Sequence, residues 1–179
     1  MHYTTNYQSP ISAITLASDG ENLTGLWMDG QKYHGAGIID IPTTQENLPV
    51  FAQTKDWLDQ YFEGEKPDLS SLPLAPFGST FRCEVWKILC KIPHGEYITY
   101  GEIARQIAAK ANKSRMSSQA VGGAVGHNPI SIIIPCHRVI GANGNLTGYA
   151  GGIDKKIKLL VHEGVDISRF FIPKTGAAL

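Results

Sequence analysis

The chain has 179 residues with 16 basic and 16 acidic side chains, so its formal net charge at pH 7 is zero. Its three cysteines, Cys83, Cys90 and Cys136, are odd in number and form no CxxC pair, which argues against a disulfide framework and a thiolate zinc site. No apolar run approaches the roughly 20 residues of a membrane span, and the first residues lack the pattern of a signal peptide. We therefore expect a soluble cytoplasmic protein with no metal, no cofactor and no membrane partner.

The charge is distributed unevenly along the chain. Residues 1–78 hold three basic and ten acidic side chains, whereas residues 79–179 hold thirteen basic and six acidic ones. Such asymmetry suggests two modules, of which the basic one meets a polyanion. The stretch 67–79 contains three prolines and has the composition of a linker. The predicted domains are residues 1–74 and residues 79–166, followed by a tail over residues 167–179.

The first module has the pattern of a small antiparallel sheet followed by one helix. Short alternating runs between residues 3 and 27 are broken by a Ser-Pro pair and an Asp-Gly pair, which predicts short strands joined by turns. Leu23–Met28 is expected to be the third strand. Apolar residues then recur at helical spacing from about residue 46 to residue 63, and Gly64 is expected to end that helix.

Two helices are predicted at the ends of the second module. The first covers residues 81–92, with one broad apolar face and Thr80 as its cap. The last covers residues 155–163, with Asp154 as its cap and Gly164 as its stop. The residues of the last helix expected to face the core are Ile157, Leu160 and Val161.

Between these two helices the sequence predicts a helix, a turn and another helix. Thr99 and Glu102 have the spacing of a capping box, which starts a helix continuing over residues 103–110. A polar and basic turn follows, and Ser117 is then the expected cap of a helix over residues 118–126. In a basic module this order suggests a helix-turn-helix, although most isolated helix pairs are structural. The fold class expected for the whole chain is α/β (α+β).

The helix over residues 118–126 has unusually small side chains. It contains Gly122 and Gly123, each of which costs roughly 1 kcal/mol relative to alanine in a helix interior. The usual compensation is the close approach of another backbone. The approaching backbone could belong to another part of the protein, or it could be the phosphodiester backbone of a nucleic acid.

The stretch from residue 128 to residue 140 carries the chemically distinctive residues. Ile130–Ile134 has the composition of a short buried strand, and Pro135 stops it because proline has no amide hydrogen for a ladder. Cys136, His137 and Arg138 follow directly. A thiol beside an imidazole and a guanidinium lies in an electropositive place that favours the thiolate. The alternative is a small apolar cysteine at a strand end with two solvated neighbours.

A nucleophilic cysteine needs a base, and the base needs an orienting group. His137 is the adjacent candidate base, although neighbouring side chains of an extended chain point in opposite directions, so a water bridge to Cys136 is reasonable. Glu163, near the end of the last helix, is a candidate for orienting His137.

Seven motifs in order and spacing resemble those of a known family. The segment from Asn128 to Val139 resembles the signature of the methylated-DNA–protein-cysteine methyltransferases, also called O6-alkylguanine-DNA alkyltransferases. The resemblance extends over about residues 79–164. The other matching motifs are Val85-Trp86, Ile92-Pro93-x-Gly95, Thr99 to Ala104, Ala120-Val121-Gly122, Thr147 to Gly152 and Leu159 to Gly164.

The resemblance implies a DNA repair protein that acts once, by irreversible transfer of the alkyl group of O6-methylguanine, and more weakly of O4-methylthymine, to Cys136. His137 would take the thiol proton through a water, Glu163 would hold His137, and Tyr100 would donate to the guanine ring. It also implies a ribonuclease-H-like first domain and a winged-helix-like second domain. The residues implied for the substrate pocket are Asn128, Val139, Tyr149, Ala150 and Gly151.

The partner that the resemblance implies is double-stranded DNA containing O6-alkylguanine, bound by a monomer through the minor groove. The damaged nucleotide would be flipped out of the stack. Many family members carry an arginine where this chain has Gln119, so the residue that fills the emptied stack here would be uncharged. The residues implied for DNA binding are Gln119, Ala120, Gly122, Gly123, Arg115 and Arg138.

Three other readings remain to be weighed. A non-enzymatic alkylation sensor of the same fold would lack the acceptor cysteine, which is present here. A helix-turn-helix regulator with dual function would carry an additional four-cysteine zinc module, which this sequence does not contain. A cysteine hydrolase with a Cys-His-Glu triad would turn over, whereas an alkyltransferase is inactivated stoichiometrically.

Overall fold

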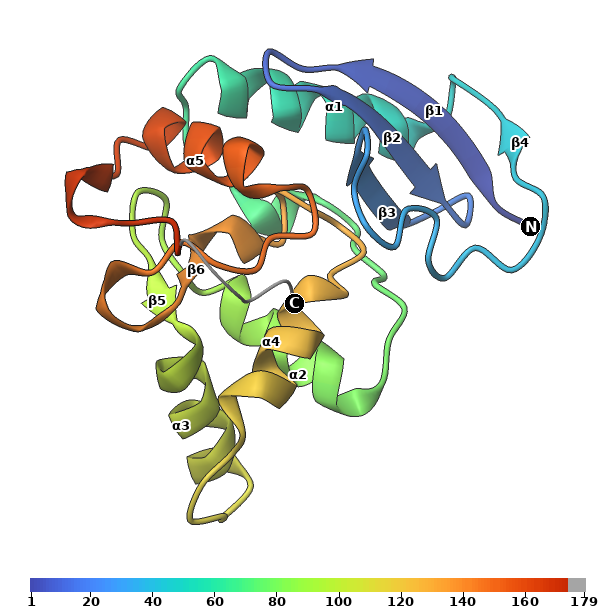
Figure 1. Cartoon of the computed structure of the whole chain (residues 1–179). Coiled ribbons are helices and arrows are strands. Elements are labelled where there is room, and N and C mark those ends of the chain that lie inside the picture. Colours follow the sequence, from blue (N-terminus) through green and yellow to red (C-terminus); the bar gives the residue numbers. More distant parts are fainter. Residues whose placement is uncertain (174–179) are drawn as a thin grey trace. The chain divides into compact units, whose positions relative to one another are not determined.

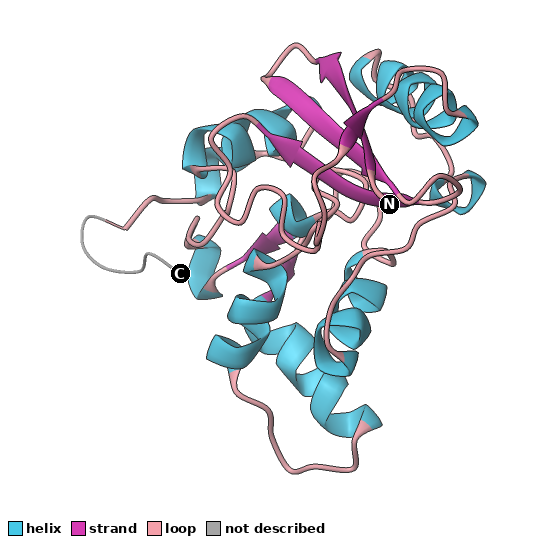
Figure 2. Cartoon of the chain, turned by 90° about the vertical axis from the view of Figure 1, so that its right-hand side faces the viewer, coloured by secondary structure: helices cyan, strands magenta, loops and turns pink. Residues whose placement is uncertain are grey.

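The computed structural model describes residues 1–173, which form two compact units with a mixed α/β architecture (Figures 1 and 2). One unit comprises Met1–Phe77 together with Pro129–Ile133, and the other comprises Gly78–Asn128 and, among the described residues, 134–173. The expected fold class is confirmed. The return of Pro129–Ile133 to the first unit was not predicted. The end of the predicted tail, residues 174–179, lies outside the described residues.

The first unit is built on a four-stranded sheet with the order β3-β2-β1-β4. β1 (Tyr3–Gln8), β2 (Ala13–Ser18) and β3 (Leu23–Met28) form the predicted antiparallel meander. β4 (Thr43–Thr44) pairs in parallel with β1 and was not expected, because two threonines give no periodicity to read.

The helix of the first unit, α1 (Pro49–Phe62), covers this sheet and packs against β2 and β3 (Figure 1). Proline occupies its first turn, where the missing amide hydrogen costs nothing. Phe51 and Leu58 are fully buried on the face toward the sheet. The helix ends at the predicted glycine, since Gly64 has a φ of +90°, a conformation that residues with a Cβ rarely adopt.

The second unit contains three helices that pack together: α2 (Thr80–Leu89), α3 (Tyr100–Lys110) and α4 (Ser118–Gly126). The Thr99–Glu102 capping box is confirmed, and so is the Ser117 cap of α4. The predicted Thr80 cap is wrong: the preceding residue, Ser79, accepts the capping hydrogen bond, and Thr80 is already helical.

The remaining elements of the second unit form a smaller layer. β5 (Ile98–Thr99) pairs in parallel with β6 (Val139–Ile140), and α5 (Ile153–His162) contributes to a core with Ile140, Leu146, Leu160 and Val165. The short 3₁₀ helices of the chain are η1 (Leu69–Ser71), η2 (Cys136–Arg138), η3 (Ala142–Gly144) and η4 (Ile167–Arg169).

Two expectations for α5 are wrong. Gly152 occupies its N-cap position and no side chain caps the helix, so Asp154 lies in the first turn instead. Val161 is 51% exposed, because the buried stripe of α5 runs one position away, through Leu159 and Leu160. The predicted stop is confirmed, since Gly164 has a φ of +79°.

The predicted strand Ile130–Ile134 is also wrong. Only Ile130 forms a bridge, with Leu26 of β3, and the amide of Ser131 then donates to the carbonyl of Leu26 at 2.9 Å. Ile132 has a φ of +69°, which turns the chain instead of extending it. The apolar run reflects burial of the whole segment, and a buried turn has the same composition as a buried strand.

Candidate active site

Cys136 begins the 3₁₀ turn η2 and is buried, with 3% of its surface exposed. The side-chain amide of Asn128, just after α4, donates to the carbonyl of Ile134 at 2.7 Å and approaches Sγ of Cys136 at 3.1 Å. Asn128 therefore links the end of α4 to the turn that carries the thiol. A donor directed at sulfur favours a negative charge there.

His137 is completely buried, and its Nε2 lies 2.7 Å from Oε1 of Glu163. The two residues come together because η2 contacts α5, at whose end Glu163 is the C-cap. Burial lowers the pKa of His137 below its ordinary value, against the opposing effect of Glu163. The imidazole is therefore neutral near pH 7, and its buried Nδ1 has no hydrogen-bond partner among the described residues.

Arg138 forms an ion pair with Glu163 instead of reaching the surface. Its Nε donates to Oε2 at 2.8 Å and its Nη2 donates to Oε1 at 2.9 Å, while Nη1 donates to the carbonyl of Ile92 at 2.5 Å. Only 9% of Arg138 is exposed. The expectation that Arg138 binds DNA is therefore wrong: a guanidinium committed to a buried carboxylate is not available to phosphates.

Gly95 completes the surroundings of Glu163 and was not predicted as a site residue. Its amide donates to Oε2 of Glu163 at 3.2 Å. It has a φ of +81°, and a Cβ at this position would lie 3.0 Å from the backbone oxygen of Glu163. The Pro-x-Gly after α2 was noted in the sequence as a motif of the family resemblance; the contact gives a physical reason for glycine at this position.

Burial would raise the pKa of Glu163, but hydrogen bonds from His137 and Arg138 outweigh it and hold the pKa well below its ordinary value. Glu163 is thus an anion with donors on both oxygens. Its geometry can orient an imidazole, as the sequence suggested.

Tyr100, the first residue of α3, is 7% exposed, and its hydroxyl donates to the carbonyl of Gly148 at 2.9 Å. Burial, and secondly Cys136, raise the pKa of Tyr100, so the phenol keeps its proton and can act as a donor. The loop that it touches continues into Tyr149 and Ala150, which are half-buried, and Gly151, which is buried. These expected pocket residues are therefore consecutive with the carbonyl that Tyr100 holds.

Lys156 is a buried cation that sequence reasoning missed. Its Nζ donates to the carbonyls of Val139 at 2.5 Å and Thr147 at 2.8 Å, and none of its surface is exposed. Burial lowers its pKa to about 8, while the nearby Cys136 acts in the opposite direction. A signal was present: Lys156 falls on the same helical stripe as Leu159, Leu160 and Glu163, where a lysine is unusual.

The expected DNA-binding helix, α4, has one buried and one open face. Gln119 and Ala120 are exposed near its start. A Cβ added at Gly123 would meet nothing within 4 Å, so no contact within the protein requires glycine there. Gly122, by contrast, is buried, and its expected DNA contact stays a prediction.

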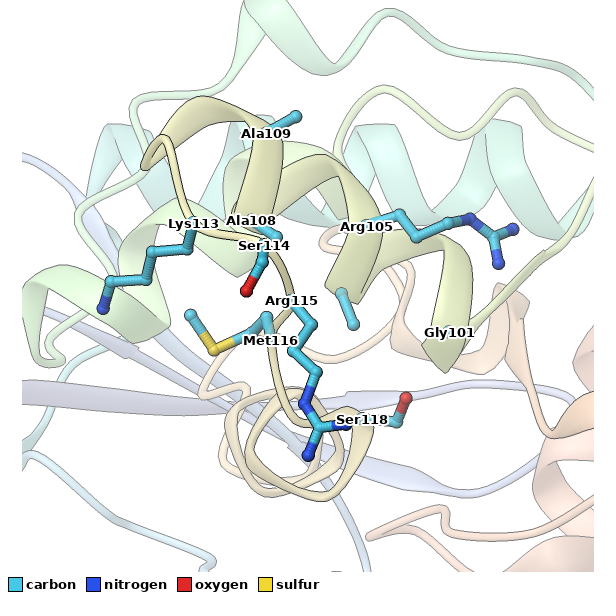
Figure 3. Close-up of a pocket in the computed structure, with 10 residues that line it drawn as sticks. Gly101, Arg105, Ala108, Ala109, Lys113, Ser114, Arg115, Met116 and Ser118 are labelled. Carbon is cyan, nitrogen blue, oxygen red and sulfur yellow. The ribbon is translucent and has the colours of Figure 1, made fainter.

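A cavity of about 400 Å³ lies between α3 and the turn that precedes α4 (Figure 3). Three cationic side chains line it, Arg105, Lys113 and Arg115, and no carboxylate does. In Figure 3 the side chain of Arg115 extends toward Ser118, at the start of α4, while Lys113 and Arg105 point to opposite sides. The cations are thus spread along an edge instead of converging on one point.

Within residues 1–173 no group of three or more His, Cys, Asp or Glu side chains could hold a metal ion. In the same part of the chain no helix is long and apolar enough to cross a membrane.

Known proteins match this architecture along nearly the whole chain. The family model described as 6-O-methylguanine DNA methyltransferase, DNA binding domain, matches residues 80–165, and the model of the ribonuclease-like domain of the same family matches residues 1–76. The chain therefore belongs to the 6-O-methylguanine DNA methyltransferase family.

Individual relatives agree with this membership. The methylated-DNA–protein-cysteine methyltransferase of Methanosarcina acetivorans is 46% identical over 88% of this chain and 96% of its own length. The enzyme of that name from Haemophilus influenzae is 40% identical over 91% and 87%. The crystal structure of the Mycobacterium tuberculosis O6-methylguanine methyltransferase superposes with a TM-score of 0.76 at 43% identity, covering 98% of this chain and 97% of that one. The structure of Mycobacterium tuberculosis OGT in complex with DNA gives 0.74 at 44% identity, covering 94% of each chain.

Proposed function

We propose that this protein repairs DNA by moving the alkyl group from O6 of guanine to Cys136, in a single irreversible event. The observation that carries the proposal is the buried constellation at η2, where Asn128 points a donor at the sulfur and the neighbouring His137 is held by Glu163. The relatives named as methylated-DNA–protein-cysteine methyltransferases support the same reaction.

The reaction begins with the thiol proton, which passes to His137, directly or through a water. The sulfur electron pair then attacks the alkyl carbon, forming an S–C bond while the C–O6 bond breaks and its electrons move onto the guanine. The guanine takes up one proton, which balances the one lost by the thiol. The thioether product is stable, so Cys136 is consumed.

Tyr100 and the loop that it holds would form the pocket around the flipped base. The Tyr100 hydroxyl donates to Gly148 in this structure, so it must exchange that partner for the guanine ring when the base enters. The carbonyls of Cys136 and Val139 would accept from the exocyclic amine, although Val139 also accepts from Lys156. Tyr149 would wall the pocket, with the Ala150 amide near O6 and Gly151 giving the backbone room.

The exposed face of α4 would enter the minor groove of the DNA, where small side chains allow close approach and the degenerate base pattern suits a search without sequence preference. Gln119 would occupy the stack after the base leaves, and Ala120 and Gly123 would lie against the groove. Arg115 would contact phosphates from the turn before α4. Flipping costs a few kcal/mol, which these contacts must offset.

Mass spectrometry after incubation with DNA containing O6-methylguanine tests the proposal. One methyl group is expected on the peptide that holds Cys136, in an amount no greater than that of the protein. The peptides of Cys83 and Cys90 serve as internal controls, and a methyl group on either, or repeated turnover, would contradict the proposal. Cys136→Ala is expected to abolish transfer and to retain DNA binding.

We also propose weaker activity on O4-methylthymine, a monomeric state and a cytoplasmic location. The family resemblance supports the first two. The location is supported by the three cysteines Cys83, Cys90 and Cys136, none of which forms a disulfide bond in the structure, as a reducing compartment favours.

A further inference from the structure

The carboxylate of Glu163 binds two buried side chains at once, those of His137 and Arg138. Its Oε1 accepts from Nε2 of His137 and from Nη2 of Arg138, and its Oε2 accepts from Nε of Arg138 and from the amide of Gly95. Each oxygen therefore accepts two hydrogen bonds, which together use all of the roughly four acceptor sites of an ionised carboxylate. Because both oxygens already accept hydrogen bonds, neither has a free site for a proton, and Glu163 stays ionised.

The state of His137 follows from this arrangement. Because Oε1 of Glu163 can only accept, Nε2 of His137 must carry the hydrogen, which leaves Nδ1 as the acceptor of a neutral ring. The charges balance without the imidazole, since the Arg138 guanidinium already neutralises Glu163. If Arg138 were absent, the carboxylate would lie buried beside His137, and an imidazolium would be the nearest way to neutralise it.

We propose that Arg138 is a positioning residue for the transfer of the Cys136 proton. Its pairing with Glu163 keeps His137 in the neutral form that carries hydrogen on Nε2 and accepts at Nδ1. The proton step is the cleavage of the S–H bond, with the proton bound at Nδ1 and the electron pair left on sulfur. Arg138 acts through Glu163 and His137. The inference rests on the proposed function, because it assigns Cys136 as the group that loses the proton.

The charged groups around His137 act on its pKa in opposite directions. Burial lowers the pKa of His137 most, Glu163 raises it, and Arg138 and Lys156 lower it. Removing Arg138 therefore leaves the raising effect of Glu163 opposed by Lys156 alone among these charges. A second titratable group, Cys90, lies near Arg138, and burial raises the pKa of its thiol, so it remains neutral near pH 7.

Nitrogen NMR of the full chain with ¹⁵N-labelled histidine reads the tautomer directly. The signal of His137 is assigned among the six histidines by its loss in His137→Asn. In the wild-type protein the neutral ring with hydrogen on Nε2 is expected at pH 7. In Arg138→Met the titration midpoint of His137 is expected to rise by at least about one pH unit, and methyl transfer at pH 7.5 to fall at least about tenfold, the low end of what a general base contributes.

Two further variants complete the comparison. Arg138→Lys keeps the charge but can no longer donate to both oxygens at once, so its midpoint is expected between those of the wild type and Arg138→Met, with partial recovery of transfer. Arg169→Met makes the same exchange at an exposed arginine of η4, outside the site, and is expected to leave midpoint and rate unchanged. If Arg138→Met does not fold, Arg138→Gln removes the charge with a polar side chain and serves the same test.

A wild-type ring with hydrogen on Nδ1 would overturn the inference, as would a folded Arg138→Met or Arg138→Gln with the wild-type midpoint and rate. Failure of the proposed function is distinguishable, because it would appear as absence of methyl on Cys136 in the wild-type protein, whatever the tautomer of His137.

Discussion

At the scale of single residues, the site is organised by buried charges instead of by exposed ones. Glu163, Arg138 and Lys156 all lie among or beside apolar groups, where an unpaired charge is costly. Glu163 and Arg138 neutralise each other. The hydrogen-bond acceptors of Lys156 are the carbonyls of Val139 and Thr147, and no carboxylate is among them. No carboxylate therefore offsets the cost of burying its ammonium group, and its pKa is lowered.

The pKa of about 8 for Lys156 predicts a change of stability with pH. The unfolded chain holds this proton up to about pH 10.4, whereas the folded protein releases it from about pH 8, so raising the pH across this window favours the folded state. Relative to Lys156→Met, the wild-type free energy of unfolding is expected to increase by on the order of 3 kcal/mol between pH 7.5 and pH 10.5. Urea unfolding of both proteins measures this difference, and a difference independent of pH would show that the lysine titrates normally.

The same residues mark the limit of sequence reasoning. Cys136 and His137 were predicted from one motif and Glu163 from another, and the structure brings His137 and Glu163 into contact. Arg138 was expected to bind DNA from the family resemblance, whereas its burial depends on a carboxylate 25 positions later that no local pattern reveals.

At the scale of elements, the sequence predicts features that depend on a single turn of chain, such as helix caps. It does not predict features that depend on packing against distant segments. The Thr99–Glu102 capping box and the Ser117 cap satisfy backbone amides within their own helices, so the sequence alone determines them. The prediction of a strand at Ile130–Ile134 was wrong because the conformation of this segment depends on β3, which lies more than a hundred residues earlier in the chain. α4 lies between these cases: its caps were evident, but its buried and open faces were not.

Gly123 of α4 gives a prediction in which stability and function move in opposite directions. Because a Cβ there meets nothing within 4 Å, Gly123→Ala is expected to stabilise the protein by up to about 1 kcal/mol through helix propensity. The same methyl group would stand on the face proposed to enter the minor groove, so the affinity for duplex DNA is expected to fall. Thermal unfolding and a DNA titration measure the two effects. Unchanged or tighter binding would mean that this face does not approach the DNA.

At the scale of the whole molecule, the acidic and basic side chains are divided between the two halves of the sequence. The basic half is the one that matches the DNA binding domain of the family. This distribution was readable from composition, because charge needs no knowledge of the fold. The proposed interface uses little of that charge on α4 itself and places it instead on the neighbouring turn and the cavity beside it.

The affinity for DNA is accordingly expected to fall with salt. Each phosphate neutralised contributes a slope of roughly −0.9 in a plot of log affinity against log salt concentration. Arg115→Gln is expected to make the slope shallower by about one such contact, whereas Lys66→Gln, at an exposed site of the acidic half, leaves it unchanged. Equal slopes for wild type and Arg115→Gln would exclude Arg115 from the phosphate contacts.

The return of Pro129–Ile133 to the first unit has a consequence for dissection of the protein. A fragment that begins at Gly78 would carry Ile130, Ile132 and Ile133 without β3, whose Leu26 forms the bridge with Ile130. Such a fragment would expose an apolar loop shortly before Cys136, and we expect it to precipitate or to require detergent. Limited proteolysis in the 67–79 stretch should instead yield two pieces that remain associated, since the cut severs one covalent link and leaves the strand-edge contact in place.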